Sequence, residues 1–411
     1  MKEIFFFLIL TFVVFGIDYY AYQAFKTLFP LQTVSGKIVT GLYWSFTLFI
    51  IISIVVTAMY GQQNIPKFLK MLTAAIFFFG LLSKIFAITW LFGEDVFRSI
   101  SFAFKKLSSQ SPTVQLEDRR KFISQMAILS AFVPFLVLSY GVLRNAYNYQ
   151  FHKINLSLKK LPKNFKGFTI VQLSDIHSGS FNQTKPIQKA IDKINALNPD
   201  LIVFTGDLVN DLAEEMDEYK AIFSQLKAKH GVFSVLGNHD YGAYAFGSED
   251  SPEKRANFEA FLKVHQDMGW DLIRNSNRIL EIDGERISLI GVENWSVNSH
   301  FPSGGDMKKA YEGIDPNSLQ ILLSHDPSHW DAQVRKEYPN VDLMLSGHTH
   351  GFQFGIETKW FKWSPSQYAY KQWAGLYQEA EQFLYVNRGF GNLGYPGRVG
   401  ILPEVTVITL T

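Results

Sequence analysis

The chain has 411 residues, enough for more than one domain of the usual ~100 to 200 residues. It contains no cysteine, which excludes disulfides, thiolate metal sites and cysteine nucleophiles. The net charge of +2 hides a division, because residues 1–150 carry 13 basic and 6 acidic side chains, leaving 26 basic and 31 acidic ones after them. The excess of acidic side chains in the second part would repel the phosphate backbone of a nucleic acid, so no nucleic-acid partner is expected.

Residues 1–150 are predicted to be a membrane region. Each of four apolar stretches approaches or exceeds the ~20 residues that a helix needs to cross a bilayer. Asp18 in the first stretch and Lys84 in the third either mark a pathway or, in the interpretation we favour, lie near an interface with their charged ends in water. We therefore expect the lipid bilayer as a partner and transmembrane helices at residues 4–24, 38–60, 71–92 and 122–142.

The connections between these stretches predict an orientation. The connection 94–121 is richer in basic residues than the connection 61–70, so the positive-inside rule places it in the cytoplasm. With four spans, both termini and the residues after ~150 then face the periplasm or outside of the cytoplasmic (inner) membrane. Lysines just after the last span weaken this bias. The basic residues compared are Arg98, Lys105, Lys106, Arg119, Arg120 and Lys121 against Lys67 and Lys70, and the opposing lysines are Lys153, Lys159 and Lys160.

A paired arginine precedes the fourth apolar stretch. The segment 118–124, D-R-R-K-F-I-S, resembles a twin-arginine export signal, although it follows three spans instead of opening the chain. The alternative is an arginine pair that flanks a span on its cytoplasmic side. Both interpretations place Arg119 and Arg120 inside.

Residues 151–411 alternate predicted strands with predicted helices. The pair Asp283-Gly284 is a strong hairpin signal. Early parallel units followed by hairpins indicate mixed sheets covered by helices, an α/β sandwich. Strands are predicted at 168–173, 201–204, 232–236, 271–273, 278–282, 287–292, 319–323, 342–345, 383–386 and 404–410, and helices at 185–197, 214–229 and 257–268.

Metal-capable side chains follow five of these strands. The carboxyl ends of strands are where open α/β sheets build ligand sites. Any one of these residues alone is more typical of a turn, but metal-capable residues at the ends of five strands indicate one site. This site includes five of the ten histidines. The residues are Asp175 and His177, Asp207, Asn238 and His239, His325, and His348 and His350.

The donor set indicates the kind of centre. It mixes oxygen and nitrogen donors, has no sulfur and is too large for one tetrahedral ion, which suits two divalent ions such as manganese, iron or zinc. Paired ions can hold both the attacking and the leaving oxygen of a displacement at phosphorus. Asp207, central in the series of motifs, is the candidate bridging carboxylate.

The motifs Asp-x-His, Gly-Asp, Gly-Asn-His-Asp, a lone His and Gly-His-x-His, in this order, resemble the calcineurin-like metallophosphoesterase superfamily. The resemblance covers about residues 165–411 and is greatest to the bacterial branch that is membrane-associated or exported by the twin-arginine route. It implies a sandwich of two mixed β-sheets flanked by helices, and a phosphoric ester hydrolase whose nucleophile is a metal-bound hydroxide. The implied ligands are Asp175, His177 and His350 for the first metal, Asn238, His325 and His348 for the second, and Asp207 for both.

His239 is the expected catalytic residue. The resemblance implies that it protonates the leaving oxygen or steadies the phosphate. Independently, it adjoins a proposed ligand, and imidazole titrates near neutrality, as a general acid requires. The alternative is a histidine that only supports the ligands.

Two departures from the family pattern bear on the substrate. Asn210 and Asp211 stand where protein phosphatases have an aspartate and then an arginine, which argues against protein phosphatase activity. Phe352 replaces the second glycine of a usual Gly-Gly-Gln, and its ring could narrow or cover the site.

The closing segment adds a candidate substrate contact. Arg388 follows a predicted strand and either binds a substrate phosphate or forms a surface salt bridge. The aromatic residues before it form either a lip at the membrane interface or the core patch of a long loop. They are Trp360, Trp363, Tyr368, Tyr370, Trp373 and Tyr377.

The sequence thus predicts a membrane region at 1–150 and a phosphoesterase domain at 151–411. The expected function is hydrolysis of phosphomono- or diesters on an envelope or lipid-linked substrate. One alternative is a pyrophosphatase of nucleotide-linked acyl sugars, which needs a cytoplasmic site. Another is a metal-binding scaffold or transport protein without turnover, which the complete set of expected ligands and His239 argues against.

Overall fold

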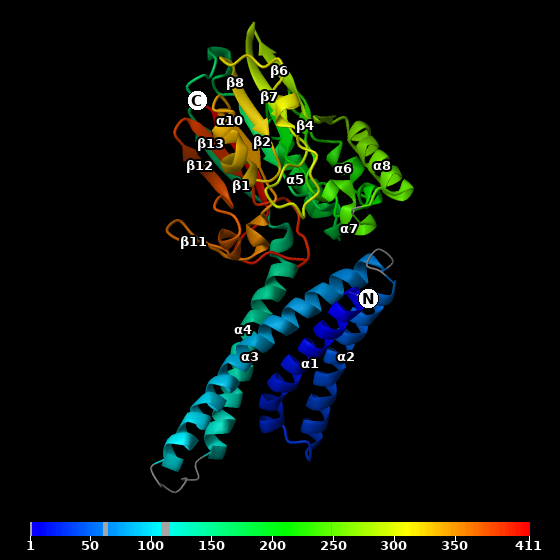
Figure 1. The fold of residues 1–411 in the computed structure, drawn as a ribbon, viewed down its shortest axis with the longest axis vertical. Coiled ribbons are helices and arrows are strands. Elements are labelled where there is room, and N and C mark those ends of the chain that lie inside the picture. Colours follow the sequence, from blue (N-terminus) through cyan, green and yellow to red (C-terminus); the bar gives the residue numbers. More distant parts are fainter. Residues whose placement is uncertain (1, 61–64, 108–115, 248) are drawn as a thin grey trace. The chain divides into compact units, whose positions relative to one another are not determined.

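The computed structural model of the protein describes residues 2–60, 65–107, 116–247 and 249–411. The chain divides into two compact units, Met1–Leu143 and Arg144–Thr411. Figure 1 shows long helices in the first unit, and strands with short helices in the second. Parts of the predicted connections, residues 61–64 and 108–115, lie outside the described residues.

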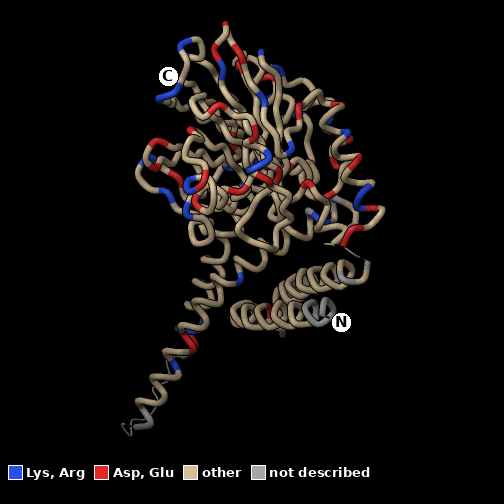
Figure 2. The backbone as a smooth tube through the Cα atoms, turned by 45° about the horizontal axis from the view of Figure 1, so that its top comes forward, with Lys and Arg blue, Asp and Glu red and all other residues tan. Residues whose placement is uncertain are grey.

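The first unit consists of four long helices, which we call the membrane unit. Each is long and apolar enough to cross a bilayer. Figure 2 shows how few charged residues these helices carry compared with the second unit. The helices are α1 (Lys2–Leu28), α2 (Val34–Tyr60), α3 (Lys67–Leu107) and α4 (Leu116–Leu143).

The predicted connection at 94–121 is wrong over most of its length, because α3 continues to Leu107 and α4 begins at Leu116. Residues 94–107 contain no glycine or proline, so nothing in that sequence ends the helix. Contacts also hold this part of α3 in place: Arg119 of α4 forms an ion pair with Glu94 at 2.7 Å, and Tyr20 of α1 donates to Asp95 at 2.6 Å.

Asp18 and Lys84 bind each other inside the membrane unit. Lys84 Nζ lies 2.5 Å from Asp18 Oδ1, and the two side chains are only 12% and 2% exposed. Thr47 of α2 donates a hydrogen bond to the same carboxylate, and Tyr43 donates to the Asp18 carbonyl at 2.8 Å. The favoured expectation of two charges in water near an interface is therefore wrong, because the pair joins α1 to α3 in the interior.

Replacing Asp18 with asparagine is expected to destabilise the membrane unit by about 3 kcal/mol, because Lys84 then stays buried without its counter-ion. The measurement is the temperature at which the full-length protein in detergent loses its monodisperse elution peak. The double variant Asp18→Asn/Lys84→Met should recover most of the loss. A single variant as stable as the parent protein would contradict a buried ion pair.

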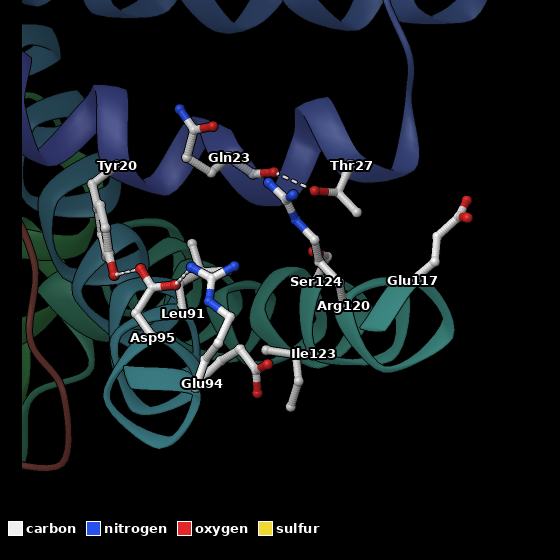
Figure 3. A pocket seen from close by; sticks show the side chains of 11 residues that line it. Tyr20, Gln23, Thr27, Leu91, Glu94, Asp95, Glu117, Arg120, Ile123 and Ser124 are labelled. Atoms are coloured by element: carbon white, nitrogen blue, oxygen red, sulfur yellow. Dashed lines mark hydrogen bonds and ion pairs between the residues drawn. The ribbon is translucent and has the colours of Figure 1, made fainter. Parts of the chain in front are cut away.

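A polar cavity of about 500 Å³ also lies in the membrane unit (Figure 3). Arg98 binds Asp95 at its wall at 2.6 Å, and Arg120 extends from α4 toward α1. Of the paired arginines in the sequence, one thus binds Glu94 and the other lines this cavity, and a role in export stays a prediction. The lining residues are Tyr20, Gln23, Thr27, Leu91, Glu94, Asp95, Arg98, Glu117, Arg120, Ile123 and Ser124.

The second unit, which we call the catalytic unit, contains two six-stranded mixed sheets. The first sheet has the order β1 (Gln150–Leu156), β14 (Glu404–Leu410), β2 (Thr169–Leu173), β3 (Leu201–Phe204), β4 (Val232–Ser234) and β5 (Asp271–Leu272). The second has the order β12 (Gly375–Glu379), β13 (Gln382–Val386), β9 (Leu343–Ser346), β8 (Leu319–Leu323), β7 (Glu285–Gly291) and β6 (Ser276–Ile282).

The two sheets pack face to face with helices outside them, as the sequence predicted. Ile170 and Val203 of the first sheet share one buried cluster with Leu289 and Ile321 of the second. On the other face of the first sheet, α5 (Lys185–Asn195) and α8 (Pro252–Met268) contribute to a separate core. The strands β2, β3 and β4 are parallel, as are β7, β8, β9 and β13, so their carboxyl ends gather at one edge of each sheet.

The predicted helix at 214–229 is largely wrong. The segment forms only two short turns, η5 (Ala213–Met216) and α6 (Lys220–Phe223). Glu215 accepts hydrogen bonds from the backbone N–H groups of Asn210, Asp211 and Leu212, which holds the preceding loop against the first turn. Two edge strands, β1 and β12, were not predicted, because their mixed polar and apolar residues give a weak strand pattern.

Candidate metal centre

Every residue expected from the sequence to bind metal lies at the carboxyl end of a strand in the structure. Two groups of donor atoms form, and within each group the atoms lie within 4.8 Å of one another. The first sheet supplies a carboxylate to both groups, and the second sheet supplies an imidazole to both. The groups are Asp175, His177 and His350, and Asp207, His325 and His348.

The nitrogen atoms of the first group converge closely. His177 Nε2 lies 3.0 Å from His350 Nε2, which lies 3.2 Å from Asp175 Oδ1. Asp207 Oδ2 lies 3.5 Å from His177 Nε2 and 3.1 Å from His325 Nε2. Asp207 therefore lies between the two groups, where a bridging ligand would be required.

Asn238 joins the second group. Its Oδ1 lies 2.8 Å from His348 Nδ1, which lies 3.3 Å from His325 Nε2. The other amide atom, Nδ2, donates to the Tyr244 hydroxyl at 2.9 Å and so directs Oδ1 toward the imidazoles. His325 Nδ1 donates to the Thr205 carbonyl at 2.7 Å, which leaves its Nε2 free to accept a metal.

The backbone around the donors is strained. Asp175, His177, Asp207, His348 and His350 all have φ between 47° and 70°, a left-handed conformation that residues other than glycine rarely adopt. Such conformations cluster at functional sites, where the surrounding structure enforces them. A glycine beside the donors serves the same geometry: a Cβ on Gly347 would collide with the Asp175 carboxylate and with Ser174 Oγ. The turn therefore needs glycine at 347 for the strand ends to meet.

Three residues that the sequence analysis did not assign to the metal site support the donors. The Asp240 carboxylate accepts hydrogen bonds from the N–H groups of Asp207 and Gly237 at 2.9 and 2.8 Å. The Tyr370 hydroxyl lies 2.7 Å from His348 Nε2, and Asp326 Oδ2 lies 3.7 Å from the same atom. Partners of this kind fix the orientation of metal-binding histidines. Asp240 and Asp326 each follow an expected site histidine directly, a signal that was available in the sequence.

His239 lies at the margin of the centre and is partly exposed. Its backbone N–H donates to Asp207 Oδ1 at 2.9 Å. Its Nδ1 lies 2.7 Å from the carbonyl oxygen of Asn210, and because a carbonyl only accepts, Nδ1 carries the proton of that bond. The Nε2 atom is left to exchange a proton with a bound molecule.

Burial and charge work against each other at these donors. Burial alone would raise the pKa of Asp207, but the neighbouring imidazoles, His325 foremost, hold it well below its usual range. Burial lowers the pKa of His177 well below its ordinary value. At His325, burial acts in the same direction but the carboxylate of Asp207 outweighs it and raises the pKa to about 10. Two buried carboxylates facing converging imidazoles form a donor set that fits divalent cations.

The remaining expected residues lie elsewhere. The Arg388 guanidinium is 5% exposed and binds Glu357 at 2.5 Å and Glu404 at 2.6 Å. Arg388 thus forms ion pairs, as one of its two expected roles required, but they are buried and not at the surface. Substrate binding by Arg388 stays a prediction. Phe352 is 65% exposed, so its ring does not fill the site. The aromatic residues at 360–377 do not all have the same environment, since Trp373 is buried whereas Trp360 is 87% exposed.

Comparison with known proteins agrees with this fold and site. Residues 168–352 match the family model for the calcineurin-like phosphoesterase, and residues 2–146 match that for a probable calcineurin-like phosphoesterase transmembrane domain. The uncharacterized metallophosphoesterase YkuE of Bacillus subtilis is 32% identical over 263 residues, which cover 63% of this chain and 84% of YkuE. The fold and the site define a metallophosphoesterase.

Two further relatives are more distant. A zebrafish (Danio rerio) transmembrane protein with metallophosphoesterase domain is 28% identical over 293 residues, or 70% of this chain, and the chain spans 63% of that relative's length. The UDP-2,3-diacylglucosamine pyrophosphatase LpxG of Chlamydia trachomatis is 27% identical over 286 residues, covering 58% of this chain and 82% of LpxG. The chain belongs to the calcineurin-like metallophosphoesterase family and is a membrane protein, and its family indicates a phosphoric ester hydrolase that uses divalent metals.

Proposed function

We propose that this chain is a membrane-anchored phosphoesterase with a dinuclear metal centre, which hydrolyses a phosphomono- or diester bond in a lipid-linked or envelope substrate. The observation that carries the proposal is the pair of donor groups with Asp207 between them and His239 beside them. Among the described residues, every ligand and proton donor that such a reaction needs is present.

The donors divide between two cations. Asp175, His177 and His350 would hold the first, while Asn238, His325 and His348 would hold the second, with Asp207 shared. Two divalent ions there, manganese, iron or zinc, would lower the pKa of a water molecule and stabilise the charge that develops on the phosphoryl oxygens.

His239 would supply the proton for the leaving oxygen. Because its Nδ1–H is held by the Asn210 carbonyl, the ring is oriented and Nε2 is the atom that exchanges the proton. A positioned histidine of this kind is an effective general acid near neutral pH. Asn210 and Asp211 supply no arginine for a phosphate, which favours a substrate other than a phosphoprotein.

Apolar side chains beside the centre favour an amphiphilic substrate. The edge of the Phe301 ring lies against His348, with 4.9 Å between ring centres. Tyr244, whose ring centre lies 4.5 Å from that of His239, is 48% exposed. Together with membrane attachment, this apolar rim supports a substrate with acyl chains.

A second candidate function is hydrolysis of the pyrophosphate of a nucleotide-linked acyl sugar, supported by the similarity to LpxG, which is named for that activity. It requires a cytoplasmic catalytic unit, whereas the basic residues near the end of α3 and the start of α4 favour an outward-facing one. Protease treatment of intact spheroplasts separates the two. Digestion of residues beyond 150 is expected, and their protection would contradict the outward orientation.

Removal of metal tests the proposed chemistry. Full-length protein stripped with a chelator is expected to lose hydrolysis of bis-(p-nitrophenyl) phosphate, and added Mn²⁺ is expected to restore it. Release of p-nitrophenolate is the measurement, and mock-treated protein is the control. Failure to hydrolyse with Mn²⁺, Fe²⁺ or Zn²⁺ would refute the proposal and favour a scaffold without turnover.

A further inference from the structure

A small hairpin in the catalytic unit exposes large apolar side chains. The strand β10 (Ile356–Glu357) pairs with β11 (Lys362–Trp363), and Figure 1 shows this hairpin projecting from the body of the unit. Trp363 Nε1 contacts the hydroxyl of Tyr368, which lies farther along the same loop. We call the exposed side chains the aromatic tip: Ile356 (51% exposed), Trp360 (87%), Phe361 (55%) and Tyr368 (78%).

Interactions at the base of the hairpin fix its position on the catalytic unit, so the aromatic tip is an ordered part of the fold. Glu357 accepts two hydrogen bonds from the buried Arg388, at 2.8 and 2.5 Å. Lys362 donates to the carbonyl of Ala374, and its Nζ lies 4.4 Å from the centre of the buried Trp373 ring. Interactions at both strands therefore hold apolar side chains out of the core. Such exposed clusters mark interaction surfaces.

The tip's position in the catalytic unit points to the partner. Gly355 N donates to Val399 O at 2.9 Å, and Gln150 N donates to Pro403 O at 2.8 Å. Val399 and Pro403 are four residues apart, a span of at most about 15 Å. Gln150 opens β1, the first strand after α4, and Leu143 at the end of α4 precedes it by at most about 25 Å of extended chain. The base of the hairpin is thus tied, through residues 399–403, to the start of β1, the first strand that follows α4 in the chain.

We propose that the aromatic tip inserts into the interfacial layer of the bilayer that holds the chain's own helices. Tryptophan and tyrosine prefer this layer, where an apolar ring and a polar atom can both be accommodated. Lys359, whose Nζ lies 5.1 Å from the centre of the Trp360 ring, adds a positive charge beside the tip for lipid phosphates. The tip's residue types and its tether both fit a lipid surface.

Docking of the tip also positions the metal centre. The hairpin begins six residues after His350, and its loop leads to Tyr370, whose hydroxyl lies 2.7 Å from His348 Nε2. Both ends of the loop therefore reach the donor groups. The tip brings these groups to the head-group layer, where a lipid phosphoester can be reached without leaving the bilayer. This last step, unlike the docking itself, rests on the proposed function.

The docking is tested with single cysteines, because a chain without cysteine gives a unique labelling site. Full-length Trp360→Cys and a matched control, Ile279→Cys, are labelled with a nitrobenzoxadiazole fluorophore and reconstituted in phosphatidylethanolamine/phosphatidylglycerol liposomes. Ile279 is 48% exposed and lies on β6, an edge strand of the second sheet. Nitroxide-labelled lipids are expected to quench the label at 360 severalfold more than that at 279. Equal quenching would overturn the docking, whether or not the protein is active.

The role in substrate access has its own readout. In the same liposomes, Trp360→Ser/Phe361→Ser is expected to lower the rate on a lipid-embedded phosphodiester severalfold relative to the rate on soluble bis-(p-nitrophenyl) phosphate. An unchanged ratio would overturn the access role. Absence of activity on both substrates in the parent protein would refute the proposed function while the quenching result still decides the docking.

Discussion

Asp207→Asn is expected to reduce Mn²⁺-dependent phosphodiester hydrolysis by about a thousandfold or more. Asparagine keeps the shape of the side chain but removes the negative charge that lies between the two donor groups, so the proposed centre would lose transition-state stabilisation worth several kcal/mol. The same variant should bind less metal. Initial rates and metal content of the purified full-length protein, determined by elemental analysis, measure the two effects.

Asp217→Asn is the matched control for this change. Asp217 is an exposed carboxylate ten residues further along and belongs to neither donor group. It should keep both the activity and the metal content of the parent protein. Full activity in Asp207→Asn would exclude a bridging role and require a different centre.

His239→Ala is expected to reduce turnover by about a hundredfold or more, the usual contribution of a general acid. The loss should be greatest for esters with poor leaving groups, such as phenyl or alkyl phosphodiesters, and smaller for p-nitrophenyl esters, because p-nitrophenolate leaves without protonation. Metal content should remain unchanged. Rates across a series of leaving groups measure this dependence.

His230→Ala controls for loss of an imidazole, since His230 precedes β4 at the end opposite to His239. An equal loss of rate for every leaving group in His239→Ala would exclude proton donation. It would leave His239 as a residue that only orients Asp207, to which its backbone already donates.

The strands around the site could be predicted because their sequences are unusually clear. Strands β3 and β8 are buried along their whole length. The sequence of β3 is a continuous apolar run and that of β8 is broken only by Gln320, which is typical of strands covered on both faces. The polar residues that follow such runs must lie where the strands end. The grouping of the donors followed from the order of the motifs and their resemblance to a family, and the structure places the same residues together.

Other features depend on contacts between distant residues, which no local pattern encodes. The pairing of Asp18 with Lys84 joins helices that the sequence describes only one at a time. Tyr370 reaches His348 from a loop whose path cannot be deduced from its composition. The charged residues at 94–107 indicate where the chain leaves the apolar span but not whether the helix ends there, because a helix accommodates charged residues as well as a loop does, and α3 continues to Leu107.

The left-handed backbone at Asp175, His177, Asp207, His348 and His350 links metal binding to folding. Each such residue costs on the order of 1 to 3 kcal/mol, and the buried carboxylates of Asp175 and Asp207 face the imidazoles of His350, His177 and His325 as well as backbone N–H groups. A ligand that binds only the folded form stabilises it in proportion to the logarithm of its free concentration. The cations would then act both as cofactors and as ligands that stabilise the folded state. The melting temperature of the catalytic unit would rise with the concentration of free Mn²⁺. Metal supply would therefore control the lifetime of the folded protein as well as its rate of catalysis.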